Sequence, residues 1–170
     1  APLWSRGLGD VYKRQTTLAA DTPAPATREL PLAAGVDISP AGVYLLDGLD
    51  LSPEMIEKAK ARRVYRALGE ADLTASVMLD PVYDVVICVG VFSHPRSQPF
   101  DLVTLFAGLK PGAVLVATVN GKGWRDIDWE TLLEQSRREH GFNVENISDI
   151  PYLTQQGIPG KLLVIRPSPS

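Results

Sequence analysis

The segment from Tyr83 to Val91, YDVVICVGV, constrains the fold of this chain more than any other segment. Its β-branched and apolar side chains follow one another without alternation, so a strand made of them needs apolar cover on both faces. The segment 113–120, AVLVATVN, has the same character. Between the two, residues 99–109 carry apolar side chains at helical spacing. Two such strands joined by a helix favour an α/β fold.

Strands and helices alternate along the rest of the organised region, which we predict to run from residue 44 to residue 166. Ser52 and Pro53 are typical of a helix start, and Gly141 is typical of a helix end. The other predicted elements are strands at 44–51, within 64–72, at 142–147 and at 161–166, and helices from 53 to about 63 and at 128–140. This alternation predicts a doubly wound, Rossmann-like, mostly parallel sheet. The short connection between the last two strands predicts an antiparallel edge hairpin.

The first 43 residues differ in composition from the rest of the chain. Residues 16–34 are rich in Thr, Ala and Pro, a composition that does not bury enough surface to become ordered. Residues 5–15, SRGLGDVYKRQ, can be back-translated with ordinary codons into a sequence that resembles the transposon-end adapter of DNA-library preparation, and we interpret them as translated adapter. We therefore predict a disordered or artefactual segment at 1–43, a partial domain at 44–166 and a C-terminal tail at 167–170.

Composition and charge narrow the classes of function. The 170 residues suffice for one domain and are few for two. The net charge of −3 gives no electrostatic reason to expect nucleic acid or an anionic membrane as a partner. The single cysteine excludes an internal disulfide and a cysteine-based zinc site, and it favours a cytoplasmic location. No apolar run approaches the roughly 20 residues that a membrane helix needs.

Acidic residues stand at the ends of two predicted strands. Asp50 ends the strand at 44–51, and Asp72 ends the next one. Ligands of open α/β sheets bind beyond the carboxyl ends of the strands, and Gly90 lies at a third such end. A carboxylate in this position can accept both hydrogen bonds from a ribose diol. The alternative interpretation of Asp50 is an acid that belongs to the turn or to the helix start.

Four segments, in this order and spacing, resemble the class I S-adenosylmethionine-dependent methyltransferases: LDGLDLSPEMIEKAKAR, GEADLT, YDVVICVGVFSH and LKPGAVLVATV. The likeness is strongest to the small-molecule type that includes the Williams–Beuren region methyltransferase-like protein. It covers roughly Asp47 to Val119. The resemblance implies S-adenosyl-L-methionine as the cofactor and methyl transfer to an acceptor that we expect to be a small molecule. It leaves the acceptor and the oligomeric state open.

The resemblance also implies roles for residues that follow the first two predicted strands. Asp50 would bind the ribose hydroxyls, and Leu51 and Met55 would line the adenine side. Asp72 would accept a hydrogen bond from the adenine amino group. Leu73 would supply a backbone contact.

By the same resemblance, Cys88, Val89, Gly90 and Val91 would form the wall beside the methionine part, and residues 92–94 would face the methyl acceptor. From the residues alone, Cys88 is equally consistent with a buried core position.

Four further side chains have two interpretations each. His94 is the best candidate for a general base, which is needed only if the acceptor must lose a proton, but a lone histidine in a turn is the more common case. Trp124 and Trp129 follow a strand end where an acceptor pocket would lie, yet packing of the next helix explains them equally well. His140 suits the negative end of a helix. We expect no metal site.

The sequence departs from the methyltransferase pattern at its start. The first strand of that family and its glycine-rich loop, of the D-x-G-x-G kind, should precede Asp47, and nothing between Thr16 and Tyr44 matches them. We therefore expect this first strand and loop to be missing through N-terminal truncation, which would open the sheet at a central position. A non-catalytic methyltransferase-like fragment or interaction module is the main alternative. A nicotinamide-dependent Rossmann enzyme is the weaker one, since its G-x-G-x-x-G loop is also absent.

Overall fold

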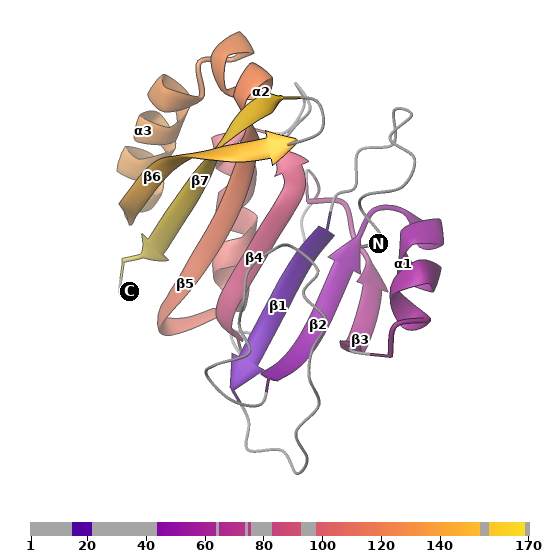
Figure 1. Ribbon diagram of the computed structural model, residues 1–170. Helices are drawn as coiled ribbons and strands as arrows, with labels where there is room; N and C mark the ends of the chain where they lie inside the picture. The colour runs from indigo at the N-terminus through magenta and orange to yellow at the C-terminus, as the bar shows by residue number, and fades with distance from the viewer. Residues whose placement is uncertain are drawn as a thin grey trace.

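The computed structural model describes residues 15–21, 44–63, 65–73, 75, 83–92, 98–153 and 157–168. Figure 1 shows how these residues form one sheet with helices packed on it. The strands are β1 (Gln15–Asp21), β2 (Tyr44–Asp50), β3 (Tyr65–Glu70), β4 (Tyr83–Phe92), β5 (Leu109–Asn120), β6 (Phe142–Leu153) and β7 (Ile158–Pro167). The helices are α1 (Pro53–Lys60), the 3₁₀-helix η2 (Pro99–Gly108), α2 (Gly121–Asp126) and α3 (Trp129–His140).

The strands form a seven-stranded sheet in the order β3-β2-β1-β4-β5-β7-β6. β2 pairs with β3 and β4 pairs with β5 in parallel, whereas β7 is antiparallel to both β5 and β6. β1 is antiparallel to both of its neighbours, so β2 to β6 run in one direction and β1 and β7 run in the other. The predicted Rossmann-like α/β sheet is confirmed, and so is its antiparallel hairpin at the edge.

β1 fills the central position that the sequence led us to expect empty. Its backbone pairs with β2 from Gln15 opposite Asp50 to Asp21 opposite Tyr44. On its other side it pairs with β4, where Gln15 lies opposite Val89. β1 therefore joins two strands that run parallel to each other, and it runs against both (Figure 1).

We predicted a disordered or artefactual segment at 1–43; the structure places seven of its residues, Gln15–Asp21, in strand β1, which differs from the expected disorder there. The remaining residues of that segment, 1–14 and 22–43, lie outside the described part. The segment QTTLAAD carries one large apolar residue, and although its threonines favour a strand, its two alanines and its aspartate do not. Backbone hydrogen bonds to two neighbouring strands hold β1 in place, and these depend little on side-chain identity.

Two further differences concern helices. The helix predicted at 99–109 forms as a 3₁₀-helix rather than an α-helix. The short helix α2 was not predicted; the Asn120 side chain starts it by accepting a hydrogen bond from the Lys122 amide at 2.8 Å. α3 then begins after Asp128 and stops before Gly141, which has a positive φ of 62°, as the predicted helix stop requires.

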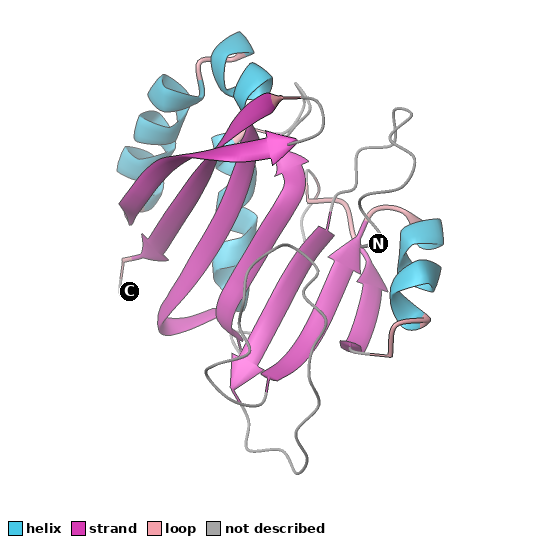
Figure 2. Ribbon diagram, viewed as in Figure 1, coloured by secondary structure: helices cyan, strands magenta, loops and turns pink. Residues whose placement is uncertain are grey.

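Helices lie on both faces of the sheet. The crossover from β2 to β3 and the crossover from β4 to β5 move in opposite directions across the sheet. Because such crossovers are right-handed, α1 lies on one face and η2 lies on the other. α3 packs beside η2, and Figure 2 shows both helices behind the strands. Among the described residues no helix is long and apolar enough to cross a membrane.

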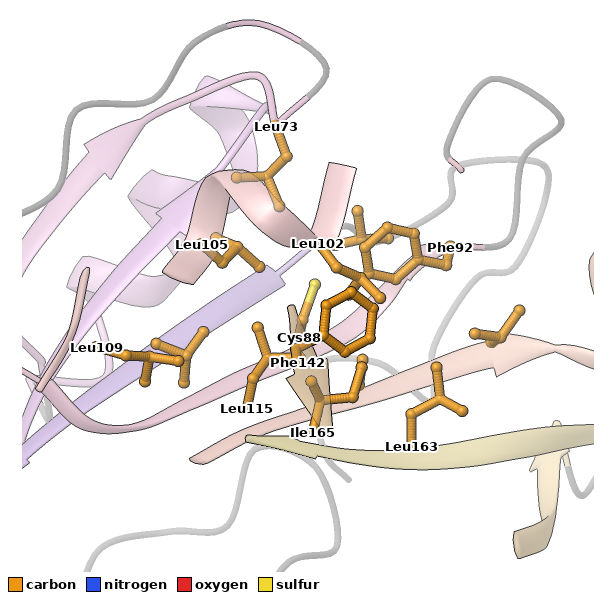
Figure 3. Packing of buried hydrophobic residues seen from close by; sticks show 14 of the residues in the cluster. Leu73, Cys88, Phe92, Leu102, Leu105, Leu109, Leu115, Phe142, Leu163 and Ile165 are labelled. Carbon is orange, nitrogen blue, oxygen red and sulfur yellow. The ribbon is translucent and has the colours of Figure 1, made fainter. Parts of the chain in front are cut away.

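The main apolar core lies between the sheet and the layer formed by η2 and α3 (Figure 3). Trp129 and Leu133 of α3 pack into it with almost no exposed surface. The members of this core with no exposed surface at all are Val86, Cys88, Leu102, Leu105, Leu115, Ala117, Val119, Leu163 and Ile165. Since β4, β5 and β7 all contribute, this core fixes the positions of the strand ends beside it.

Candidate cofactor-binding site

The carboxyl ends of β2, β3, β4 and β5 lie together at one end of the sheet, because these four strands run in the same direction. We call this end of the sheet the carboxyl edge, or simply the edge. β1 starts at this edge instead of ending there. Its first residue, Gln15, pairs with Asp50 on one side and with Val89 on the other. The edge therefore holds the predicted ribose-binding acid and the predicted methionine wall, with one strand between them.

Asp50 ends β2 and is 5% exposed. Its Oδ1 accepts a hydrogen bond from the Ser52 amide at 2.8 Å, so this oxygen belongs to the turn. Ser52 caps α1, since its hydroxyl accepts from the Met55 amide at 3.4 Å. The carboxylate thus has a local structural task as well as a position at the edge where ligands of α/β sheets bind.

The end of β3 lies beside the end of β2. Asp50 and Glu70 are register partners, and the Ala71 amide donates to the Asp50 carbonyl at 3.1 Å. The chain then reaches Asp72, which is half-buried, and Leu73, whose side chain enters the main core. The structure therefore brings the two predicted acids to neighbouring positions of one edge.

The two predicted adenine-side residues differ in exposure. Leu51 is 40% exposed, which is unusual among the large apolar residues that the structure describes. Met55 is 5% exposed and lies on the buried face of α1 with Ile56 and Ala59. Leu51 therefore offers apolar surface at the edge, whereas the Met55 side chain is part of the packing of its helix.

The end of β4 is irregular. Gly90 has a positive φ of 77°, and the pairing with β5 shifts register between Cys88 and Phe92. The Gly90 amide donates to the Thr118 hydroxyl at 3.4 Å. Bulges of this kind are common next to active sites, because they redirect the chain at the end of a strand.

The four residues of the predicted methionine wall divide into two pairs. Cys88 is fully buried and Val91 is 4% exposed, and both side chains belong to the main core. Val89 and Gly90 are half-buried and lie at the edge. In this conformation Val89 and Gly90 present surface for a wall, and the Cys88 thiol is a core group.

His94 lies outside the described residues, so its predicted role stays a prediction. Trp129 is 1% exposed and packs edge-on against Phe92 at 5.2 Å between ring centroids, which supports the packing interpretation. Trp124 is half-buried and stacks on Trp129 at 5.9 Å. His140 is the last residue of α3, as predicted.

Sequence reasoning missed two polar residues near the end of β5. Thr118 is 8% exposed and Asn120 is 7% exposed. Thr118 supports the bulge at Gly90, and Asn120 caps α2. The signal was available in the sequence, since a Thr and an Asn near the end of an otherwise apolar strand need hydrogen-bond partners.

Sequence reasoning also missed a cluster of charged and polar groups on the core side of β2. The Asp47 carboxylate accepts hydrogen bonds from Arg66, from the Ala67 amide at 3.1 Å and from the Tyr83 hydroxyl at 2.9 Å. Burial raises the pKa of Asp47, but the hydrogen bonds from Arg66 and Tyr83 lower it by more, so the pKa lies below its usual range. Burial and the bond to Asp47 raise the pKa of Tyr83 to about 12.

The edge fits S-adenosyl-L-methionine in part. The buried carboxylate of Asp50, with the exposed side chain of Leu51 beside it, suits a ribose with an adjoining base. The glycine at the end of β4 places no side chain there, which suits close approach of a ligand. The glycine-rich loop after a first parallel strand has no counterpart in β1, because β1 ends at the opposite edge.

Searches for related sequences found no matching family profile and no matching curated protein. Solved structures do match. A SAM-dependent methyltransferase from Methanosarcina mazei superposes with a TM-score of 0.56 and 15% identity, over 73% of this chain and 82% of that one. The [4+2]-cyclase SpnF matches with a TM-score of 0.52 and 16% identity, over 73% of this chain and 67% of that one.

A protein studied for the conversion of a disulfide bond into a thioacetal group during echinomycin biosynthesis matches with a TM-score of 0.53 and 20% identity. This match covers 72% of this chain and 66% of that one. Identities this low show shared architecture and leave activity open, and the cyclase illustrates that one fold hosts several reactions. The chain has the fold of the class I SAM-dependent methyltransferases.

Proposed function

We propose that the chain binds S-adenosyl-L-methionine at the carboxyl edge of its sheet and that its function is methyl transfer to a small molecule. The observation that carries the proposal is the position of Asp50. Its carboxylate is buried at the end of a parallel strand, and the Ala71 amide ties the end of the next strand, with Asp72, to the same place. A methyltransferase from Methanosarcina mazei shares this fold, which supports the choice of cofactor.

The residues of the edge would divide the binding task. Asp50 would accept the hydrogen bonds of the ribose hydroxyls, and Leu51 would cover the adenine side. Asp72 would accept from the adenine amino group, beside the backbone of Leu73. Val89 and Gly90 would form the wall at the end of β4.

The cofactor, when bound, supplies a methyl group that is already activated on a sulfonium. The protein then contributes mainly alignment and exclusion of water. A general base is required only for an acceptor that must lose a proton, and His94 is our candidate for it.

A small-molecule acceptor is supported by two features. One structure with the same fold belongs to the biosynthesis of echinomycin. The net charge of −3 provides no electrostatic attraction for nucleic acid or for an anionic membrane. We extend the proposal to a cytoplasmic location, which the single cysteine favours.

A second candidate function is binding without methyl transfer. The observation in its favour is the direction of β1, which leaves this edge without a loop that follows a parallel first strand. Under this alternative the chain would hold a ligand or a partner on the same fold and catalyse no reaction.

Calorimetric titration of the folded chain with S-adenosylhomocysteine tests the proposal. We expect micromolar binding, and Asp50→Asn should weaken it at least about tenfold, since a hydrogen bond to a charged group is lost while the turn to Ser52 can still form. Asp84→Asn is the matched control, because Asp84 is also a strand acid but lies at the opposite end of β4, paired with Lys110 at 2.8 Å. A folded chain that binds no S-adenosylhomocysteine contradicts the proposal, and binding of NADH in its place would support the nicotinamide alternative. Binding without turnover of any acceptor would support the second candidate.

A further inference from the structure

A polar cluster of three residues joins β2 and β3, on one side of β1, to β4, on its other side. We call this cluster the strap: Asp47, Arg66 and Tyr83. Arg66 Nε donates to Asp47 Oδ1 at 2.9 Å, and its terminal nitrogen donates to Oδ2. The Tyr83 hydroxyl donates to the same Oδ2 at 2.9 Å. The Asp47 side chain is 10% exposed, whereas the Arg66 side chain is 44% exposed.

The strap bridges β1. Asp47 belongs to β2 and Tyr83 belongs to β4, and β1 lies between these strands in the sheet. Neighbouring strands are about 4.8 Å apart, so the Tyr83 side chain reaches Asp47 across two such spacings. Tyr83 belongs to the main core, and Leu49, two residues after Asp47, packs against the same core, so the bridge runs over the face that carries η2.

The two sides joined by the strap carry different parts of the proposed site. Asp50 and Asp72 follow β2 and β3, whereas Val89 and Gly90 belong to β4. The pairings of β1 connect the two sides through the backbone. The strap adds a direct side-chain connection from β4 to β2.

The strap does not lie at the edge itself. Asp47 precedes Asp50 by three residues, which in a strand is about 10 Å. Its four hydrogen bonds occupy the carboxylate and leave it no task as a ligand-binding group. Replacing a buried ion pair by apolar side chains of similar volume is often neutral or stabilising, whereas the geometry of the pair is specific. A role in fixing geometry therefore suits these residues better than a role in stability alone.

We propose that Asp47, Arg66 and Tyr83 are positioning residues, which set the distance between the ribose and adenine side of the cofactor site and its methionine side. This inference rests on the proposed function. It predicts that the strap matters for a ligand that touches both sides, and matters little for a ligand that touches one.

The test compares two ligands on one variant. Tyr83→Phe removes the hydroxyl and keeps the ring in the core. We expect its affinity for S-adenosylhomocysteine, which would contact both sides, to fall between about threefold and about tenfold, the upper value being the full effect of one lost hydrogen bond to a charged group. Its affinity for adenosine, which would contact only the β2 and β3 side, should change less than about twofold. Equal losses for both ligands, or no loss for either, would overturn the inference.

Lys110→Met is the matched control. It breaks the pair of Lys110 with Asp84, the residue next to Tyr83, but this pair joins β4 to β5 within one side. We expect it to leave the affinities for both ligands unchanged. A loss of S-adenosylhomocysteine affinity in Lys110→Met equal to that in Tyr83→Phe would also overturn the inference.

Amide hydrogen exchange without ligand separates this inference from the proposed function. In Tyr83→Phe we expect faster exchange at Asp50, Ala71 and Gly90 than in the wild type, with no change in Lys110→Met. If the wild type binds neither ligand, the proposed cofactor is wrong. The exchange rates alone then test whether the strap holds the two sides of the sheet in place. Unchanged exchange at these amides in Tyr83→Phe would overturn it.

Discussion

The two sides of β1 are stabilised in different ways. On the side of β4 to β7, the sheet packs against η2 and α3, and nine residues of that core have no exposed surface. On the side of β2 and β3, α1 is the helix that the described residues place on the sheet, and the buried apolar residues of β2 and α1 are Leu46, Met55, Ile56 and Ala59. This smaller side carries both acids of the proposed site, Asp50 and Asp72.

The difference shows how a site can combine a stable scaffold with a less stable part. Apolar burial contributes about 25 cal/mol for each Å² removed from water, so the side with the larger core should open last. The β2 and β3 side depends on β1 and on the strap for its place in the sheet. Ligand-binding regions are often drawn from the less stable part of a protein.

The largest expected effect is in the main core. Leu102→Ala leaves a cavity between η2 and the sheet, and we expect the free energy of unfolding to fall by about 3 to 4 kcal/mol, measured by urea denaturation. Leu51→Ala, at a leucine that is 40% exposed, should change it by less than about 0.5 kcal/mol. Similar losses in the two variants would show that the large core does not dominate stability.

The next effect is in the strap. Asp47→Ala removes the acceptor of Arg66 and Tyr83, and we expect a loss of about 3 kcal/mol, at the lower end for a buried pair because Arg66 is partly exposed. Amide exchange should accelerate most in β2 and β3. Acceleration spread evenly over β4, β5 and β7 would mean that the two sides open together.

A pair of glycines in α2 tests the tight contact beside β7. A Cβ on Gly121 would lie 2.6 Å from the Pro159 carbonyl oxygen, whereas one on Gly123 would have its nearest neighbour at 3.7 Å. We expect Gly121→Ala to lower the free energy of unfolding by about 2 kcal/mol, since backbone must shift. Gly123→Ala should be neutral or stabilising, because alanine favours the helix. Thermal unfolding of both variants checks this, and equal effects would contradict it.

Loss of the helix cap of α1, on the β2 and β3 side, should have a smaller effect on stability. Ser52→Ala removes the hydroxyl that accepts from the Met55 amide, and we expect a loss of about 1 kcal/mol in urea unfolding. Ser52→Asp should retain most of the stability, because an aspartate also caps helices well. A Ser52→Ala variant as stable as the wild type would mean that the turn at Asp50 starts the helix unaided.

The last effect, which is confined to high pH, is a pH dependence of the strap. The pKa of Tyr83 is raised from 10.0 to about 12, so its hydroxyl stabilises the folded state below pH 10, and this contribution is lost as the pH rises from about 10 to about 12. The difference in stability between the wild type and Tyr83→Phe should shrink over this range. Titration by near-ultraviolet absorbance should show a late tyrosine step that is absent from Tyr83→Phe. A wild-type curve without this step would mean that the hydroxyl is open to solvent.

The order of the predicted elements came from local pattern. The apolar run of β4, the cap at Ser52 and the stop at Gly141 each specify an element through its own residues, and each lies where the sequence indicated. Asp50 and Asp72 were also recognisable, since the end of a strand and the start of a turn are local features. The outward Leu51 and the inward Met55 could not be distinguished, because exposure depends on how α1 sits on the sheet.

Contacts between distant parts of the chain could not be predicted from the sequence. The segment QTTLAAD has little strand pattern of its own, and its backbone pairing with β2 and β4 places it as a strand that runs against both. The strap joins residues 19 and 36 positions apart, and no local spacing marks such pairs. Thus the sequence by itself determined the strands and helices other than β1 and α2, and which acids follow them, because apolar spacing and caps act locally. Only the tertiary structure decided which strand lies at the centre, in which direction it runs and which side chains face the core, because these depend on backbone pairing and packing between residues far apart in the chain.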